Sequence, residues 1–220
     1  MAVILLTLSI SAFAVDISAG IGASGGYFIN EMKTSTATPD VSSETTITYV
    51  PFGIIAFFDA TYFQGSGGYL MLTNSYEKMT VTVSGSPSTL IDQPIVGSKS
   101  FLCFAAYAKY PFALGPLTLF PILGIEFDLN IIAIDANGND LRASMTDQQK
   151  SDANKFWLKG GFGADISFSS KAYIRPALIV GYKLPNVSEN NALISAQQAG
   201  FDVLLAPLTF DLNLLIGYRF

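Results

Sequence analysis

The side chains that most often carry catalysis are sparse in this chain. It contains no histidine, which excludes Ser-His-Asp and Cys-His nucleophiles and any metal site that needs an imidazole. Its single cysteine, Cys103, therefore has no histidine to activate it, and we interpret it as a small buried residue of a strand. We predict that the protein is not an enzyme and that it binds no cofactor.

Two carboxylates, Glu126 and Asp128, are two residues apart and would share one face of a β-strand. Such a pair could act as a general acid and a general base. That chemistry requires environments that push the two pKa values apart, whereas pairing with nearby bases explains both charges without it. We interpret Glu126 and Asp128 as ion-pairing residues.

The stretch from Asp135 to Asp140 reads DANGND and is rich in the oxygen ligands that Ca²⁺ prefers. The calcium-loop motif requires a glutamate at its twelfth position, where this chain has Thr146. Asn and Gly are also the residues that favour tight turns. We therefore predict a turn here and no metal site.

Alternation of apolar and polar residues defines the elements that carry these side chains. In the segment 208–220, every second residue is apolar and the intervening positions are mostly polar, with Leu215 as the exception. A period of two predicts a β-strand. The same pattern predicts strands at 15–29, 117–131, 155–168 and 172–184. Segments 47–59, 60–75 and 98–112 are less regular, and which of their faces points inward stays open.

The links between these segments alternate in length. Short links fall near 59–60, 113–116 and 169–170, and long polar links fill 30–46, 76–97, 132–154 and 185–206. This alternation is typical of outer-membrane barrels, whose short turns are periplasmic and whose long loops are extracellular. We predict a closed antiparallel up-and-down transmembrane β-barrel of about eight strands with both termini in the periplasm. Within two of the long links, 146–154 and 190–199 are compatible with short helices.

The composition agrees with a chain that meets lipid. Half of the 220 residues are hydrophobic, 13% are charged, and the mean hydropathy is +0.42. The most apolar run, 110–125, is shorter than the roughly 18 residues of a membrane helix and contains three prolines. The net charge is −5, and no basic patch with interleaved aromatic residues is present, so nucleic acid is not an expected partner.

Charge placement predicts which strand face meets lipid. A charged side chain on the lipid face costs about 2 to 4 kcal/mol at the bilayer midplane for Arg or Lys. The charged residues gather on one face, beside Gly and Ser, which predicts a polar lumen. The predicted lumen charges are Asp16, Glu126, Asp128, Lys159, Asp165, Arg175, Lys183, Asp211 and Arg219. Aromatic residues next to the short links predict an interface girdle: Tyr110, Phe112, Phe168, Tyr173, Tyr218 and Phe220.

The first residues look like a secretory signal. Residues 1–10 are apolar, and Ala12, Phe13 and Ala14 form the A-x-A pattern that precedes cleavage. We therefore expect a signal peptide at 1–14, cleavage before Val15, and a barrel domain at 15–220. No Lys or Arg precedes the apolar run, which indicates a signal truncated at its start. The alternative is a first strand or an N-terminal anchor.

The C-terminal residues carry a resemblance. The ending from Ile216 to Phe220 resembles the last strand of Gram-negative outer-membrane proteins, in which a terminal aromatic residue is read by the barrel-assembly machinery. Together with chain size and strand count, it resembles the small eight-stranded barrels of the OmpW-like or OmpA/OmpX-like families. The resemblance implies an outer-membrane location, contact with membrane lipid, and periplasmic chaperones and the assembly machinery as partners. It gives Tyr218 and Phe220 the role of an assembly signal.

Two functions follow from the resemblance. The interior of an eight-stranded barrel is about filled by its own side chains, which disfavours a wide pore. The first hypothesis is a narrow channel for small hydrophobic molecules, as in OmpW-like proteins, and the inward apolar residues Phe120, Ile122 and Leu215 weakly favour it. The second is a plugged barrel whose long loops bind host molecules or other surface partners, as an adhesin or structural protein.

Overall fold

Long antiparallel strands make up most of the molecule. The computed structural model describes residues 16–36, 41–95 and 97–220, so the expected signal peptide and its cleavage residues Ala12, Ala14 and Val15 lie outside the described residues. The strands are β1 (Ile17–Thr36), β2 (Val41–Ala60), β3 (Phe63–Val83), β4 (Ser86–Ile95), β5 (Gly97–Lys109), β6 (Phe112–Leu114), β7 (Leu117–Asp135), β8 (Lys155–Ser167), β9 (Ala172–Leu184) and β10 (Asp202–Arg219).

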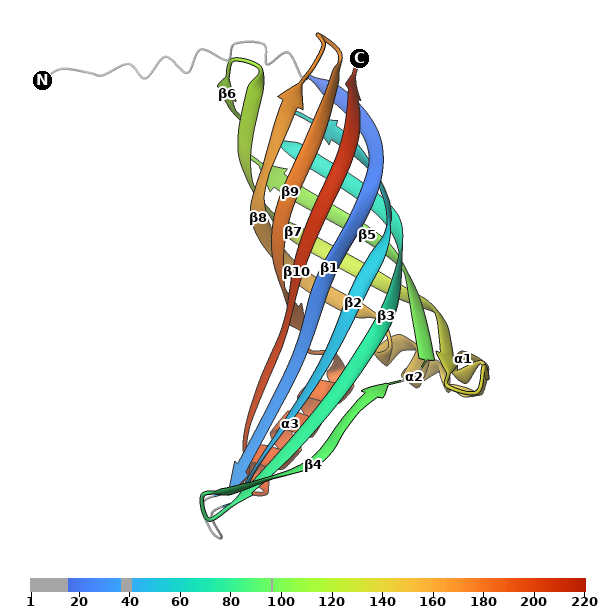
Figure 1. Ribbon diagram of the computed structural model, residues 1–220, viewed down its shortest axis with the longest axis vertical. Coiled ribbons are helices and arrows are strands. Elements are labelled where there is room, and N and C mark those ends of the chain that lie inside the picture. Colours follow the sequence, from blue (N-terminus) through green and yellow to red (C-terminus); the bar gives the residue numbers. More distant parts are fainter. Residues whose placement is uncertain (1–15, 37–40, 96) are drawn as a thin grey trace, which may run out of the picture.

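Eight of these strands close into a ring (Figure 1). The hydrogen-bonded order runs β2-β1-β10-β9-β8-β7-β5-β3, and β2 also pairs with β3, so the sheet has no free edge along the ring. Every pairing is antiparallel. The short strands β4 and β6 pair only with β3 and β7, respectively. The predicted closed antiparallel barrel of eight strands is confirmed.

One end of the barrel, which we call the short-turn rim, carries tight connections at 60–63, 109–117 and 167–172. Thr61 and Gly115 adopt left-handed backbone conformations with φ of 48° and 65°, which reverse the chain within a few residues. The backbone N–H of Thr61 donates to the Asp16 carbonyl, and that of Phe220 donates to the Ile17 carbonyl. The C-terminus and the beginning of β1 therefore lie together at this rim (Figure 1).

The opposite end, the long-loop rim, is far more ordered than the sequence predicts. The segments 30–46 and 76–97 were predicted as loops, and that prediction is wrong for most of their length. β1 and β2 stay paired out to Thr36 and Val41, and β3 pairs with β4 around the turn at Gly85. Both segments are rich in Thr and Ser with interspersed Val and Ile, and β-branched residues fit a pleated surface even where they face water.

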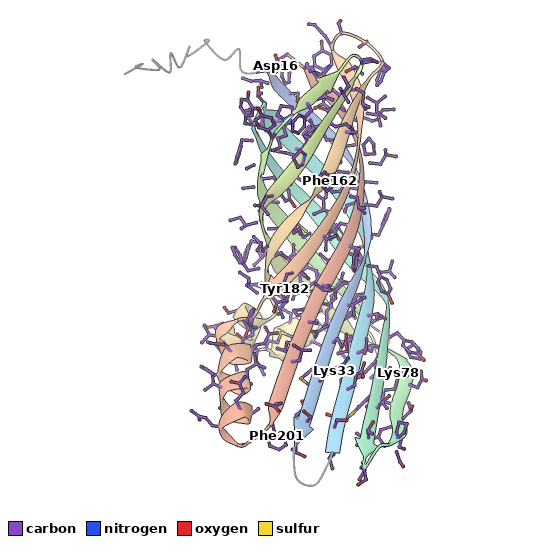
Figure 2. The ribbon with its side chains drawn as sticks, turned by 90° about the vertical axis from the view of Figure 1, so that its left-hand side faces the viewer. Asp16, Lys33, Lys78, Phe162, Tyr182 and Phe201 are labelled. Carbon is purple, nitrogen blue, oxygen red and sulfur yellow. The ribbon has the colours of Figure 1, made fainter. Side chains whose placement is uncertain are left out.

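The extended strands make the long-loop rim uneven (Figures 1 and 2). β10, β1, β2 and β3 continue well past the level at which β7 and β8 end, so they form a tall wall on one side that carries Lys33 and Lys78. On the other side the link between β7 and β8 holds the short helices α1 (Leu141–Ser144) and α2 (Asp147–Asp152). We call the four-stranded extension the tall wall.

A third helix, α3 (Val187–Gln198), lies in the link between β9 and β10. Its first turn is closed by a capping box: Asn186 accepts from the Glu189 N–H, and Glu189 accepts from the Asn186 N–H. Thr146 and Gln149 cap α2 in the same way. The predicted helical stretches 146–154 and 190–199 thus coincide with α2 and most of α3. Within the described residues, no helix is long and apolar enough to cross a membrane.

The segment from Asp135 to Asp140 forms the predicted tight turn. The Asp135 carboxylate accepts hydrogen bonds from the backbone N–H groups of Asn137 and Asn139 and from the Asn139 side chain, at 2.8 to 2.9 Å. Gly138 supplies the left-handed φ of 82°. Hydrogen bonds from Asn139 hold the pKa of Asp135 below its usual value, because they favour the charged carboxylate.

The two faces of the strands differ as the alternation predicts. On β10, Leu212 and Leu214 are 62% and 57% exposed, whereas their neighbours Asp211 and Leu215 are buried. The outer surface is therefore apolar, and the polar face is inside. On the strands whose facing the sequence left open, Phe58 of β2 and Phe104 of β5 point outward, and Cys103 is buried, as predicted.

Aromatic side chains surround the short-turn rim. Five of the six predicted girdle residues are exposed there: Tyr110, Phe112, Phe168, Tyr218 and Phe220. Tyr173 is wrong as a girdle residue, because its side chain is fully buried in the lumen and its hydroxyl lies 2.7 Å from Ser18 Oγ. Its position in β9 has the same parity as Arg175, so the strand period directs it inward.

Candidate functional site

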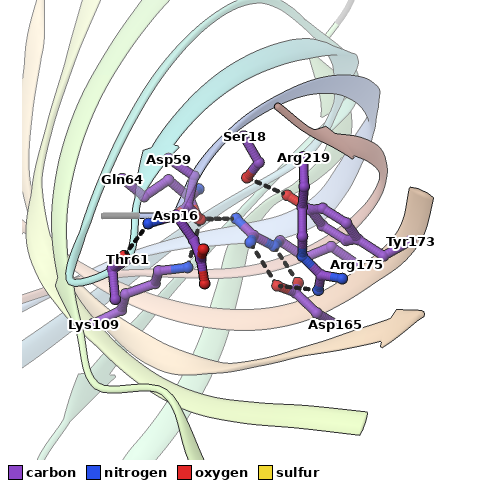
Figure 3. A network of polar contacts seen from close by, with 10 residues as sticks. All are labelled: Asp16, Ser18, Asp59, Thr61, Gln64, Lys109, Asp165, Tyr173, Arg175 and Arg219. Atoms are coloured by element: carbon purple, nitrogen blue, oxygen red, sulfur yellow. Dashed lines mark hydrogen bonds and ion pairs between the residues drawn. The ribbon is translucent and has the colours of Figure 1, made fainter. Parts of the chain in front are cut away.

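Arg175 of β9 is the centre of a charged cluster inside the barrel near the short-turn rim, which we call the rim cluster (Figure 3). Its Nε and Nη2 atoms donate to the two carboxylate oxygens of Asp165, at 2.6 and 2.9 Å. Its Nη1 atom lies 2.6 Å from Asp59 Oδ2 and donates to Gln64 Oε1 at 2.8 Å. The guanidinium thereby joins β8 and β9 to β2 and β3 across the lumen.

Further side chains complete the rim cluster. Lys109 Nζ donates to Asp59 Oδ2 at 2.5 Å, so this carboxylate receives two cations. Arg219 lies 3.9 Å from Asp165 and donates to Ser167 Oγ. The rings of Phe57, Phe120 and Tyr173 flank the Arg175 guanidinium at 4.7 to 5.1 Å from their centroids. Stacking and ion pairing together offset the cost of burying the charges.

A second charged cluster, the mid-lumen cluster, surrounds Lys159 of β8. The ammonium group donates to Glu126 Oε1 at 2.5 Å and to Asp211 Oδ2 at 2.7 Å. Tyr107 donates to the other oxygen of Glu126, and the Trp157 indole donates to Asp128 at 2.7 Å. All six side chains are buried. Glu126 is therefore ion-paired as interpreted, whereas the interpretation is wrong for Asp128, whose carboxylate accepts from a neutral indole and makes no ion pair among the described residues.

Little free volume remains around these clusters. Two cavities beside Lys159 and Asp211 each have a volume of only about 20 Å³, which is room for a single water molecule. Between the two clusters, Tyr107, Phe120, Ile122 and Ile179 pack together as an apolar layer. Phe120 and Ile122 therefore do point inward, but they fill the lumen rather than line an opening.

The structure brings together most of the residues that the sequence placed in the lumen. Asp165, Arg175 and Arg219 belong to the rim cluster, whereas Glu126, Asp128, Lys159 and Asp211 belong to the mid-lumen cluster. Lys183 lies at the long-loop rim, where it pairs with Glu189 at 2.5 Å. Asp16 is exposed at the short-turn rim, where its backbone N–H donates to Thr61 Oγ1.

Sequence reasoning missed three members of the rim cluster. Asp59, Gln64 and Lys109 are buried and paired with Arg175 or with each other. They lie at the ends of the segments whose alternation is irregular, so their facing stayed open. One signal in the sequence was available. A charged residue one or two positions from a short turn shares a strand face with a buried residue when an even number of positions separates the two.

Three buried side chains of the mid-lumen region have atoms that could ligate a metal ion. Cys103, Glu126 and Asp128 each offer one such atom, and these atoms lie within 4.8 Å of one another. One oxygen of Glu126 is already bound to the Lys159 ammonium, and one oxygen of Asp128 accepts from Trp157. A positive charge at this position opposes a divalent cation, and we assign no metal site here.

A cavity lies at the long-loop rim, between α3 and the inner face of the tall wall. Its volume is about 650 Å³, and we call it the apolar cavity. The wall contributes Met32, Ile47, Val203 and Leu205, and α3 contributes Leu193. Phe201, just before β10, also lines it and lies at the end of the tall wall that is farthest from the short-turn rim (Figure 2).

A smaller pocket of about 190 Å³ lies deeper in the barrel, at the end of the lumen next to the long-loop rim, and we call it the lysine pocket. Lys99 of β5, Lys155 of β8 and Lys183 of β9 all line it. It shares Asn30 and Lys183 with the apolar cavity, so the two are contiguous. Neither cavity was predicted from the sequence.

These features define the class of the protein. A closed antiparallel barrel with an apolar outer face, exposed aromatic residues at the rim, a polar lumen and short turns opposite long loops is an outer-membrane β-barrel. The short-turn rim is then periplasmic and the long-loop rim extracellular.

Comparison with known proteins finds similar folds but no sequence relative. No protein-family model matches the chain, and no curated protein matches it. Among solved structures it is similar to the outer-membrane protein OprG from Pseudomonas aeruginosa, with 12% identity over 94% of this chain and 96% of OprG and a TM-score of 0.47.

Two other solved structures are similar at comparable identity. Neisserial surface protein A is 12% identical over 92% of this chain and 99% of its own, with a TM-score of 0.42. Ail of Yersinia pestis, solved in complex with the heparin analogue sucrose octasulfate, is 11% identical over 93% of this chain and 99% of its own, with a TM-score of 0.35.

Proposed function

We propose that this protein is a barrel with a closed lumen that binds a ligand at the cell surface, through the cavities of its extracellular rim. The proposal selects the plugged, interacting barrel over the narrow channel. The periplasmic chaperones and the barrel-assembly machinery are its partners during export, and it catalyses no reaction.

The position of Arg175 is the observation that carries the closed lumen. Its guanidinium contacts acidic or amide side chains from β2, β3 and β8, and it stacks beside a ring from β7. A solute that passed this point would have to displace a buried cation from two carboxylates. Separating these groups would leave uncompensated charges in a buried site, which opposes opening of the rim cluster.

The extracellular rim has free volume for a ligand, which the lumen lacks. The apolar cavity has about 650 Å³ of space, within the range of about 300 to 1,000 Å³ that small-molecule sites occupy. It lies between secondary-structure elements, α3 and three paired strands. Sites built on such elements hold their shape better than sites built on loops alone.

Conductance across a planar bilayer tests the closed lumen. The refolded mature chain should insert without stepwise openings. The Arg175→Ala and Phe120→Ala variants should each produce discrete openings, because both remove bulk from the rim cluster, whereas Lys171→Ala, in the exposed turn between β8 and β9, should stay silent. Regular openings of the unmodified protein would contradict the proposal.

The narrow channel for small hydrophobic molecules stays the second candidate. The observation that favours it is that the apolar cavity and the lysine pocket, at the extracellular end of the lumen, share Asn30 and Lys183 as lining residues. Uptake of small apolar solutes into vesicles distinguishes the two. A channel raises the rate of uptake over protein-free vesicles, and a closed binding barrel leaves that rate unchanged.

A further inference from the structure

We infer that the extracellular rim binds a single-chain anionic amphiphile, of the class of a fatty acid, with its carboxylate in the lysine pocket and its hydrocarbon chain in the apolar cavity. The inference rests on the proposed surface binding and specifies its ligand. It follows from three features of the rim: the charge of the lysine pocket, the surroundings of Lys155, and the continuity of the two cavities.

The lysine pocket has an excess of positive charge. Lys99, Lys155 and Lys183 line it, and Asp152 is its single carboxylate among the described residues. Asp152 already accepts hydrogen bonds from Gln148 and Ser188. Lys183 is paired with Glu189, but Lys99 and Lys155 make no ion pair within the described part of the chain. Two ammonium groups are thus available to an anion.

Aromatic rings hold the Lys155 ammonium in position. Its Nζ lies 4.6 Å from the ring centroids of Phe28 and Phe101, and 5.7 and 5.9 Å from those of Tyr49 and Trp157. Ring faces stabilise the charge but accept no strong hydrogen bonds. Lys99 Nζ also lies 5.7 Å from the Tyr49 ring, so two cations meet at one ring. An anion bound between the two ammonium groups would offset their mutual repulsion and accept hydrogen bonds from their N–H groups.

The apolar cavity continues from the lysine pocket. Asn30 of β1 and Lys183 of β9 line both, which places a charged end and an apolar end in one concave surface. Met32, Val203 and Leu205 of the tall wall face Leu193 of α3 across this space. A highly charged sugar would find few polar partners here, whereas a hydrocarbon chain gains from leaving water. We therefore expect a ligand with an anionic group at one end and a hydrocarbon chain at the other.

The single tryptophan of the chain gives a direct probe. Trp157 is buried beside Lys155, so a bromine next to a bound carboxylate would quench its fluorescence. We would titrate the mature protein in phosphatidylcholine nanodiscs with 2-bromododecanoate. Quenching should saturate and be reversed by unbrominated dodecanoate. The neutral 2-bromododecane and the short 2-bromobutyrate should each require at least about tenfold higher concentrations. The first has no carboxylate for the lysine pocket, and the second has no long chain for the apolar cavity.

Variants separate the site from partition of the probe into lipid. Lys99→Met leaves both ammonium groups beside the Trp157 ring in place and should weaken binding about tenfold, as expected for loss of one charged hydrogen bond. Leu205→Asn should weaken binding of the long-chain probe and leave the short-chain probe unaffected. Lys150→Met, on α2 and outside both cavities, is the matched control and should bind normally.

The outcomes are decisive in both directions. Quenching that never saturates, or that is the same for the acid and for neutral 2-bromododecane, overturns the inference, as does normal binding by Lys99→Met. This titration does not depend on the bilayer measurement. A conducting barrel that still binds dodecanoate refutes only the closed lumen, and a silent barrel without saturable quenching refutes only the anionic amphiphile.

Discussion

Arg175 and Asp165 face each other on adjacent strands and form a two-point ion pair, with Nε to Oδ1 at 2.6 Å and Nη2 to Oδ2 at 2.9 Å. The pair is closed on its other side by Asp59, whose carboxylate lies 2.6 Å from the same guanidinium. One cation therefore neutralises carboxylates from opposite walls of the barrel. This interaction joins the walls of the barrel, and in the proposed function it also keeps the lumen closed.

Removing this cation should destabilise the barrel strongly. Arg175→Met leaves Asp165 and Asp59 buried with fewer partners, and we expect the free energy of unfolding in lipid vesicles to fall by about 3 to 5 kcal/mol. The measurement is urea unfolding followed by tryptophan fluorescence. Arg219→Met is the control, since that side chain is 29% exposed and lies 3.9 Å from Asp165, and it should cost about 1 kcal/mol or less. Equal losses in the two variants would contradict this account of the rim cluster.

The position of the bilayer along the barrel is open to a test within one strand. Leu212 and Leu204 both point outward from β10 and are 62% and 61% exposed, but they are eight residues apart. Leu212→Arg should place a charge in hydrocarbon at a cost of about 2 to 4 kcal/mol, whereas Leu204→Arg, on the tall wall, should cost about 1 kcal/mol or less. Vesicle unfolding measures both. A comparable cost at position 204 would mean that the tall wall is also immersed in lipid.

Much of the fold could be predicted because a barrel repeats one simple rule. Apolar and polar residues alternate in β10 from Leu208 onward with Leu215 as the exception, and burial alternates from Leu208 to Tyr218. The eight-strand count followed from the same rule together with the link lengths. The rule is uninformative where both faces meet water, and this is why the paired extensions at 30–36 and 76–83 read as loops.

The site was predictable only where it lies inside the membrane. Charges such as Lys159 and Asp211 stand out against an apolar strand, so the polar lumen could be inferred. The lysine pocket could not, because Lys99 begins an irregular strand and Lys155 follows a long link. Their approach depends on the register between the strands and on which face of 98–112 points inward, and the sequence alone left both open.

Close packing in the lumen makes one glycine sensitive to a single methyl group. A Cβ at Gly217 would lie 2.2 Å from Cζ of Tyr173, a fully buried ring, so one of them must move. We expect Gly217→Ala to lower the free energy of unfolding by about 1 to 3 kcal/mol. Gly65→Ala is the control, because its Cβ would meet only the Phe63 ring at 3.9 Å. If Tyr173→Leu does not rescue Gly217→Ala, this contact is not the cause.

The predicted signal peptide has a direct chemical test. The A-x-A pattern of Ala12 and Ala14 predicts that the protein recovered from outer membranes begins at Val15. Mass spectrometry of the intact protein measures this. Ala14→Leu should block processing and retain the precursor, and Ala19→Leu, in β1 of the barrel domain, should leave the cleavage site unchanged. Retention of Met1 on the inserted protein would refute the prediction.

The terminal aromatic residue separates assembly from stability. Phe220 is 78% exposed and its ring lies 5.7 Å from that of Tyr218, so the folded barrel gains little from its side chain. If Phe220 acts as an assembly signal, Phe220→Ala should reduce the amount of folded protein in outer membranes several-fold in cells, yet change the free energy of unfolding of the refolded protein by about 0.5 kcal/mol or less. Phe168→Ala is the matched control, an aromatic residue of the same rim with 64% exposure. It should assemble at normal levels. An equal loss of assembly in both variants would show that the girdle as a whole, and not the C-terminus, is what the assembly machinery recognises.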